Sequence, residues 1–308
     1  MITNFNLNKI KKTTLIIILT LIPFFNNNIY SLDKKTAIET NDKIIEEGKM
    51  LFNTEISSWY GSEIFQENYK GDKSKVGGYF SYYSKDKNQF INVFYNNDNS
   101  PKIIHTIRFQ NESQEIEASK KNTNKENINK ETVNKDNVKK ESIVRDMTDF
   151  ENDLFIMRKK TLDLMPKDTI FKNYDNTNIN VIPFVYNGEK KVYLITVPKI
   201  PNIVTLGNDY EIIFDKNNNI SSKKRLHTDI LAVDYGNDKN RGITYHTHLK
   251  STGDYFTVTD IASLLLFGKT AGWLQHYLIS ENWVAMWDIS NEKFTIKTKK
   301  EFDQENGK

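Results

Sequence analysis

Two histidines and an aspartate near the C-terminus form the pattern best suited to chemistry in this chain. His246 and His248 are one residue apart at the end of a predicted strand, so both imidazoles are expected on the same face of that strand. Asp260 stands in the first turn of a predicted helix. Two neutral imidazoles and one carboxylate are ligands of a catalytic zinc ion, which keeps its fourth position for water. The spacing therefore predicts a zinc site at His246, His248 and Asp260.

Each of these residues also has a purely structural interpretation. Thr257 precedes Asp260 by three residues, which is the spacing of a capping box at a helix start. Such a cap places the carboxylate but does not stop it from binding a metal ion. The chain has only five histidines, so a chance His-x-His pair is improbable. His105 and His227 show no partner spacing, and we predict a structural role for both.

The segment around these residues resembles the JAB/MPN/JAMM metalloprotease superfamily. The run Tyr245-His-Thr-His248 matches the His-x-His of that family, and Thr257-Val-Thr-Asp260 matches its Ser-x-x-Asp. The resemblance covers about residues 180–298. The chain departs from the family pattern at Leu249, which replaces the usual Pro, at Thr257, which replaces Ser, and in a loop one residue longer. The whole chain is also similar to exported proteins of Bacteroidetes bacteria, a likeness that brings no function with it.

The resemblance implies catalytic roles for two further residues. Thr257 would take the role of the family's Ser and stabilise the oxyanion of a tetrahedral intermediate. The family's catalytic Glu lies on an earlier strand, and here the candidates are Glu211 and, as second choice, Asp209. These two have the same parity in an extended chain, so both could face the site. Glu211 could equally be an exposed strand carboxylate.

The N-terminus has the features of a secretory signal peptide over residues 1–31. Lys9, Lys11 and Lys12 precede an apolar run over residues 14–25, which is shorter than the about 20 apolar residues that span a bilayer comfortably. We expect a protein exported to the periplasm or secreted, with no membrane contact beyond this segment; an uncleaved anchor is the alternative. The 43 basic and 40 acidic residues nearly balance, so nucleic acid is not an expected partner.

The rest of the chain divides into three predicted parts. Residues 33–110 are expected to form a small N-terminal α+β domain, with a short amphipathic helix near residues 40–52 and three aromatic strands. Residues 111–145 are rich in Lys, Glu and Asn, so a flexible linker is predicted there. Residues 146–300 are expected to form the metal-binding domain. Its predicted elements are helices over 146–164 and 257–267 and strands over 180–186, 191–197, 211–214, 242–246, 276–280 and 283–287.

The predicted fold class is α+β. The resemblance further implies a JAMM-like, cytidine-deaminase-like mixed sheet with flanking helices at the C-terminus. The function that follows is a zinc-dependent hydrolase that cleaves a peptide or isopeptide-like amide in a peptide or protein substrate. The alternatives are a non-catalytic binding or structural module of the same fold and the payload of a toxin or effector.

Overall fold

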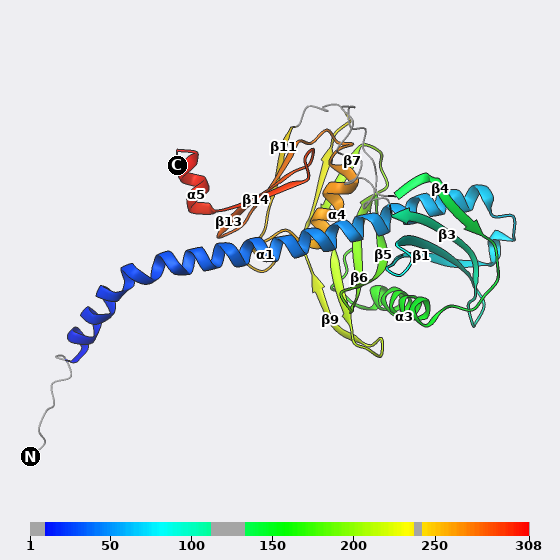
Figure 1. Ribbon diagram of the computed structural model, residues 1–308, viewed down its shortest axis with the longest axis horizontal. Helices are drawn as coiled ribbons and strands as arrows, with labels where there is room; N and C mark the ends of the chain where they lie inside the picture. Colours follow the sequence, from blue (N-terminus) through cyan, green and yellow to red (C-terminus); the bar gives the residue numbers. More distant parts are fainter. Residues whose placement is uncertain (1–9, 112–132, 237–241, 308) are drawn as a thin grey trace, which may run out of the picture.

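The computed structural model describes residues 10–111, 133–236 and 242–307 (Figure 1). For residues 10–33, 111 and 133–137 it describes the backbone and not the side chains. The described chain has a mixed α+β architecture, which confirms the predicted fold class at that level. The α-helices are α1 (Ile10–Asn68), α3 (Asp149–Leu164), α4 (Val258–Phe267) and α5 (Lys299–Glu305).

Helix α1 is far longer than the short helix predicted near residues 40–52. It runs past the C-terminal sheet and α4 to the N-terminal sheet (Figure 1). Its buried residues belong to three hydrophobic clusters: Ala37 to the first, Leu51 to the second, and Ile56 and Phe65 to the third. Tertiary packing between Ala37 and Phe65 therefore sustains this part of a helix whose local hydrophobic pattern is weak.

The predicted signal peptide cannot be compared with the structure in full. Residues 1–9 lie outside the described residues, and only the backbone of the remainder is described, as the first part of α1. Among the described residues, no helix combines the length and the apolar character needed to cross a lipid bilayer.

The three aromatic strands predicted in the N-terminal part are confirmed. They are β1 (Val76–Ser84), β2 (Gln89–Asn96) and β3 (Ile103–Asn111), which pair antiparallel in that order.

The flexible linker predicted over residues 111–145 differs from the structure in its second half. Residues 112–132 lie outside the described residues, but β4 (Val133–Glu141) pairs antiparallel with β3 as the fourth strand of the sheet. Val138 packs against a hydrophobic cluster of that sheet, and Arg108 forms a 2.8 Å ion pair with Glu141. A lysine-rich strand suits this position because charged side chains protect a sheet edge.

A second antiparallel sheet follows in the order β5-β6-β8-β9. Its strands are β5 (Thr177–Tyr186), β6 (Glu189–Pro198), β8 (Tyr210–Phe214) and β9 (Ile220–Arg225). One hydrophobic cluster joins Phe80 and Val93 of the first sheet to Leu154 of α3 and Val192 of β6. The apolar core therefore continues across the boundary that was predicted between two domains.

The C-terminal part holds a β-α-β unit. Strand β11 (Ile243–Thr247) pairs parallel with β12 (Gln275–Ile279), and α4 is the crossover between them. Strands β13 (Trp283–Asp288) and β14 (Lys293–Thr298) continue the sheet antiparallel. Parallel pairing requires such a crossover, and the apolar segment Ile261–Leu266 fits a helix that is buried on nearly every side. A separate two-stranded ribbon of β7 (Ile203–Gly207) and β10 (Ile230–Asp234) was not predicted.

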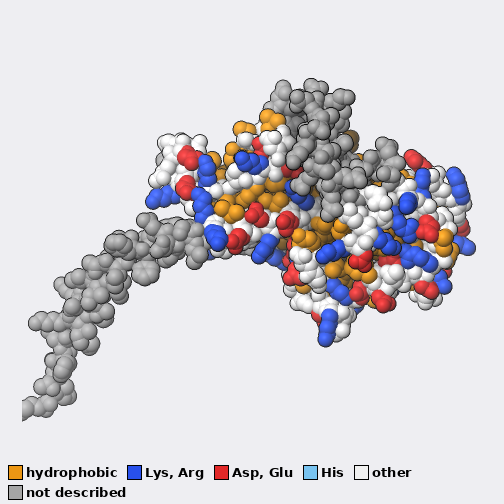
Figure 2. All heavy atoms as spheres, viewed as in Figure 1, with side chains coloured by type: hydrophobic (Ala, Val, Ile, Leu, Met, Phe, Trp, Pro, Cys, Tyr) orange, Lys and Arg blue, Asp and Glu red, His pale blue; other side chains and the backbone are white. Residues whose placement is uncertain are grey.

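The surface mixes charges of both signs. Figure 2 shows Lys, Arg, Asp and Glu side chains interspersed over the face in view, with hydrophobic side chains between them.

Gly48 allows α1 and α4 to approach each other closely. A Cβ at this position would lie 2.6 Å from Cβ of Ile261 and 3.1 Å from the carbonyl oxygen of Val258. Both residues belong to the segment that carries Asp260. The glycine therefore sets the distance between the long helix and the helix of the predicted site.

Replacing Gly48 with Ala tests this contact. Helix propensity alone would stabilise the variant by up to about 1 kcal/mol, whereas overpacking costs about 1–3 kcal/mol. Because the contact with Ile261 involves a Cβ atom that cannot rotate away, we expect a net loss of about 1–2 kcal/mol in the free energy of unfolding, measured by urea denaturation. Lys43→Ala, at an exposed position of the same helix, is the control and should change stability little. A stabilised Gly48→Ala protein would contradict the packing.

Candidate metal centre

The predicted ligands converge where β11 ends and α4 begins. His246 lies on β11, His248 follows its last residue, and Asp260 is in the first turn of α4. The side chains of His248 and Asp260 are each 1% exposed, and that of His246 is 10% exposed. The structure therefore brings together the three residues that were predicted as metal ligands.

A fourth side chain, His227, joins them. One potential ligand atom from each of His227, His246, His248 and Asp260 lies within 4.8 Å of every other. Nε2 of His246 is 3.1 Å from Nε2 of His248, and Nε2 of His227 is 3.1 Å from Oδ1 of Asp260. Oδ1 of Asp260 is also 3.6 Å from Nε2 of His246. We define these four residues as the His-Asp cluster.

These separations fit a divalent cation. Ligands about 2.0–2.1 Å from a tetrahedral ion are about 3.3 Å apart, close to the distances in the cluster. Although Nε2 of His227 and Oδ1 of Asp260 are 3.1 Å apart, neither meets the geometry of a hydrogen bond with any described residue. Buried polar atoms without partners are costly, and a shared cation would satisfy both. The cluster could therefore hold a metal ion.

A chain of hydrogen bonds orients His246. Its Nδ1 lies 2.7 Å from Nε2 of His276 on β12, and Nδ1 of His276 lies 2.7 Å from Oγ1 of Thr244. If each ring donates along this chain toward the threonine, Nε2 of His246 keeps its lone pair toward the cluster. Partners of this kind fix the tautomer of a metal-binding histidine.

Burial keeps the imidazoles in the form that binds metal ions. It lowers the pKa of His246 to about 3 and that of His276 to about 4, and it lowers the pKa of His248 as well. Burial alone would raise the pKa of Asp260, but the surrounding His227, His246 and His248 bring it well below its usual value. The neutral imidazoles of His246 and His248 therefore face an ionised carboxylate, which is the charge state of a metal ligand set.

Asp209 lies behind His227. Its Oδ2 is 3.7 Å from Nδ1 of His227, and its Oδ1 accepts a 2.8 Å hydrogen bond from the backbone amide of Thr196. Burial raises the pKa of Asp209 to about 7, against the lowering effect of His227. For His227 itself, burial lowers the pKa, and the carboxylates of Asp260 and Asp209 raise it by more. Because 3.7 Å is longer than a hydrogen bond, Asp209 acts on His227 through its charge.

The capping interpretation of Thr257 holds. Its Oγ1 accepts a 3.0 Å hydrogen bond from the backbone amide of Asp260 and donates a 2.8 Å hydrogen bond to Oδ2 of Asp260. Oδ2 also accepts a 2.8 Å hydrogen bond from the backbone amide of Thr257. Oδ2 is thereby held by the helix cap, and Oδ1 is the oxygen closest to His227 and His246. The cap therefore fixes the rotamer that presents Asp260 to the cluster.

The structure does not bring Glu211 to the cluster. Its Oε2 accepts a 3.1 Å hydrogen bond from the Tyr193 hydroxyl, which also bonds Glu47 of α1. The parity that linked Glu211 to Asp209 fails because β8 begins at Tyr210, so strand alternation does not extend back to Asp209. Of the two carboxylates considered from the sequence, Asp209, the second choice, lies next to the cluster, and Glu211 does not.

A cleft of about 400 Å³ opens onto the cluster between β10 and the end of β11. His227, His246 and His248 form part of its wall. Exposed apolar side chains surround it, with Tyr245 64% and Leu249 57% exposed. A ligand of moderate size therefore has access to three of the four cluster residues.

The sequence prediction missed His227 and His276. His227 was expected to be structural because no other potential metal ligand lies at a suitable spacing from it in the sequence, yet it lies in the cluster. His105 meets that expectation: its Nδ1 pairs with Oγ of Ser142 at 2.7 Å and its ring packs edge-on against Phe65. A single signal was available, the scarcity of histidine, since four of the five histidines in the chain meet here.

Comparison with known proteins adds no family or fold assignment. A scan against family models, a search of curated proteins and a search of solved structures each found no match to this chain.

Metal binding is the first test of the cluster. The purified chain incubated with zinc and desalted should retain about one ion, and zinc at a hundred times its Kd should raise the free energy of unfolding by about 2.7 kcal/mol. Asp260→Ala and His248→Ala should lose the ion, while His105→Gln, a change outside the cluster, should keep it. Metal analysis by mass spectrometry provides the count. A wild-type chain that retains neither zinc nor another divalent ion would exclude a metal centre.

The position of Asp209 gives a second prediction. If His227 binds the ion, Asp209→Asn should weaken metal affinity about ten- to a hundredfold, because loss of a carboxylate beside a ligating histidine has this effect in known sites; if His227 is not a ligand, the affinity should stay unchanged. Competition with a chromogenic chelator measures the change. The matched control is Asp229→Asn, since Asp229 is exposed at the same cleft and bonds the Tyr174 hydroxyl instead. Equal affinities of the two variants would show that Asp209 does not support His227.

Proposed function

We propose that the protein is a zinc-dependent hydrolase of JAMM type that cleaves a peptide or isopeptide-like amide. The observation that carries this proposal is the His-Asp cluster, in which four potential ligands lie within 4.8 Å of one another and three of them, the histidines, line a cleft. A purely structural metal site needs no such access for a second molecule. The β-α-β unit with His-x-His on its first strand and a capped Asp on its helix supports the resemblance to the JAMM superfamily.

Three residues would hold the zinc ion: His246, His248 and Asp260. Bound there, zinc supplies a Lewis acid that polarises the substrate carbonyl and lowers the pKa of water. The chain's own residues would hold the metal ligands in place and transfer protons. Thr257 holds Asp260 through the helix cap, and its assignment to the oxyanion requires its hydroxyl hydrogen to leave Oδ2 of Asp260.

The proton acceptor that fits the geometry is His227. It lines the cleft beside Asp260 and has Asp209 on its other nitrogen. A histidine beside a carboxylate can take a proton from the attacking water and return it to the leaving amine. Glu211, the residue first assigned this role, would have to leave Tyr193 to reach the cluster.

The cleft favours a polypeptide substrate. Leu231, Tyr245 and Leu249 present exposed apolar side chains at its rim, next to the polar imidazoles. Such a mixture suits the side chains and carbonyl groups of an extended peptide. The signal-like N-terminus supports the proposal that this activity lies in the periplasm or outside the cell.

A non-catalytic metal-binding module is the second candidate. The observation in its favour is that His227 could complete a four-ligand shell, which would leave no open position, while Glu211 lies elsewhere. A closed shell of four protein ligands is typical of structural zinc.

One set of variants separates the two candidates. If His227 is the base, His227→Ala should keep zinc and lower kcat on a fluorogenic peptide or isopeptide about 10²–10⁴-fold, whereas His248→Ala should lose both zinc and activity. Chelation should abolish hydrolysis and added zinc should restore it. Glu211→Gln tests the earlier assignment and should have little effect on kcat.

Two results would reject the hydrolase. The first is loss of zinc from His227→Ala, which would make His227 the fourth ligand of a closed site. The second is a zinc-loaded wild-type chain that cleaves none of a broad panel of peptides, isopeptides and cell-wall peptides.

A further inference from the structure

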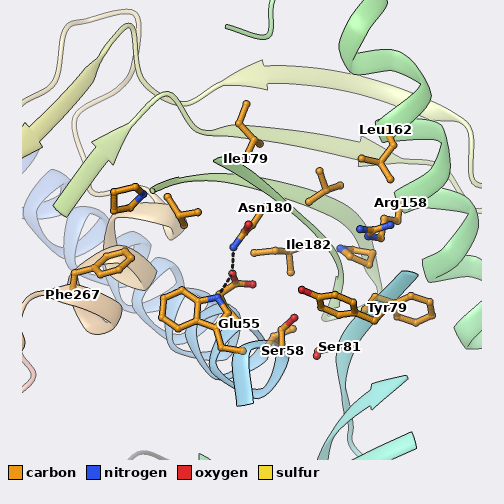
Figure 3. Close-up of a pocket in the computed structure, with 17 residues that line it drawn as sticks. Glu55, Ser58, Tyr79, Ser81, Arg158, Leu162, Ile179, Asn180, Ile182 and Phe267 are labelled. Atoms are coloured by element: carbon orange, nitrogen blue, oxygen red, sulfur yellow. Dashed lines mark hydrogen bonds between the residues drawn. The ribbon is translucent and has the colours of Figure 1, made fainter. Parts of the chain in front are cut away.

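A second cavity of about 370 Å³ lies away from the His-Asp cluster. It is lined by residues of α1, β1, α3 and β5, together with Val197 and Pro198 of β6 and Phe267 of α4 (Figure 3). None of its lining residues lines the cleft at the metal centre. Any ligand that it takes is therefore independent of the proposed hydrolase.

A buried carboxyl group forms one side of this cavity. Glu55 of α1 is 3% exposed, and its Oε1 accepts hydrogen bonds from Nε1 of Trp59, at 2.9 Å, and from Nδ2 of Asn180. Both bonds end on the same oxygen, which leaves Oε2 for another donor. Within the described part of the chain, no Lys, Arg or His nitrogen comes within 4.0 Å of this carboxyl group. Burial raises the pKa of Glu55, as expected for an acid without a counter-ion.

A guanidinium group lies on the opposite side. Arg158 of α3 is partly buried, and its Nη1 donates a 3.2 Å hydrogen bond to the Tyr95 hydroxyl. No carboxylate of the described residues lies within 4.0 Å of it. Arginine has five donors in a planar fork suited to a carboxylate. The remaining donors of Arg158 are therefore available to a ligand anion.

The space between these two groups is mixed in character. Figure 3 shows Glu55 and Arg158 on opposite sides of the cavity, with Ile182 and Tyr79 between them. The Tyr79 hydroxyl is close enough to feel both charges: burial raises its pKa, Glu55 raises it further, and Arg158 lowers it. The aliphatic side chains of Ile179 and Leu162 complete the wall. A ligand here would meet an acid, an apolar middle and a base in turn.

We infer that this cavity binds a small zwitterion, the chemical class of free amino acids and dipeptides. The ligand's ammonium group would bind Oε2 of Glu55, and its carboxylate would bind the Arg158 guanidinium. Its side chain would pack against Ile182 and its neighbours. The ligand would thereby supply a counter-ion to both Glu55 and Arg158, which removes the cost of two unpaired charges in a partly buried place.

Calorimetric titration of the full chain with leucine and with the dipeptide Leu-Leu tests this inference. Saturable binding of one or both is expected. N-acetyl and C-amide derivatives of the bound compound should bind at least about tenfold more weakly, because each blocks one charge-assisted hydrogen bond. Derivatives that bind as well as the parent would overturn the zwitterion. The inference would also be overturned if the chain bound neither compound at a ligand concentration of about 10 mM, because a Kd above that value is too weak for a useful site.

Variants then assign the two ends of the ligand. Glu55→Gln should weaken binding of the parent compound at least about tenfold and leave binding of the N-acetyl derivative unaffected. Arg158→Gln should also weaken binding of the parent at least about tenfold, but it should leave binding of the C-amide unaffected. Exposed neighbours on the same helices, Glu67→Gln and Lys159→Gln, are matched controls and should bind normally.

A third variant guards against misfolding of the first two. Ser58→Leu places a larger apolar side chain in the cavity and keeps both charged residues, and it should abolish binding while the circular dichroism spectrum stays unchanged. Normal binding by Ser58→Leu or by Glu55→Gln would place the ligand elsewhere and refute the inference.

Discussion

The burial of Asp260 among imidazoles is the constraint on which the C-terminal half of this structure depends. An ionised carboxylate that is 1% exposed is costly unless it is paired. Here the cost is divided: Oδ2 is held by the cap at Thr257, and Oδ1 faces His227 and His246. The cap leaves Oδ1 without a hydrogen-bond partner among the described residues, so the neighbouring imidazoles or a bound cation must offset its charge.

This arrangement explains the surrounding fold. Helix α4 must bring Asp260 to the end of β11, and it does so as the crossover of a parallel strand pair, buried between the sheet and α1. Gly48 lets α1 come close enough to press on Ile261, the residue after Asp260. The same parallel pairing sets His276 beside Thr244 and within reach of His246, so the sheet register also orients a cluster ligand.

The long helix α1 serves two chemically different cavities. It lines the Glu55 cavity, and it packs against α4, the helix that carries Asp260 at the metal centre. The metal centre gathers imidazoles around the ionised Asp260 carboxylate, so its charge suits a cation. The Glu55 cavity instead separates an acid from a base across apolar side chains, so its charge suits a molecule with both signs. Because their linings do not overlap, a change in one can be interpreted without reference to the other.

The local sequence determined the elements that carry His246, His248 and Asp260. The His-x-His pair lies at the end of β11, with His248 directly after the last strand residue, and the Thr257 to Asp260 spacing is realised as a helix cap. The aromatic strands near the N-terminus and the helix over 149–164 likewise follow from local hydrophobic patterns. These features depend on residues a few positions apart, which is the range over which a periodic pattern carries information.

Only the tertiary structure decided which distant groups meet. His227 follows β9, and its place beside Asp260, with Asp209 behind it, results from the packing of separate sheets. Glu211 shares parity with Asp209, but the strand starts between them and turns the two carboxylates toward different neighbours. The length of α1 and the Glu55 cavity also arise from long-range packing, because side chains from segments more than a hundred residues apart form their contacts.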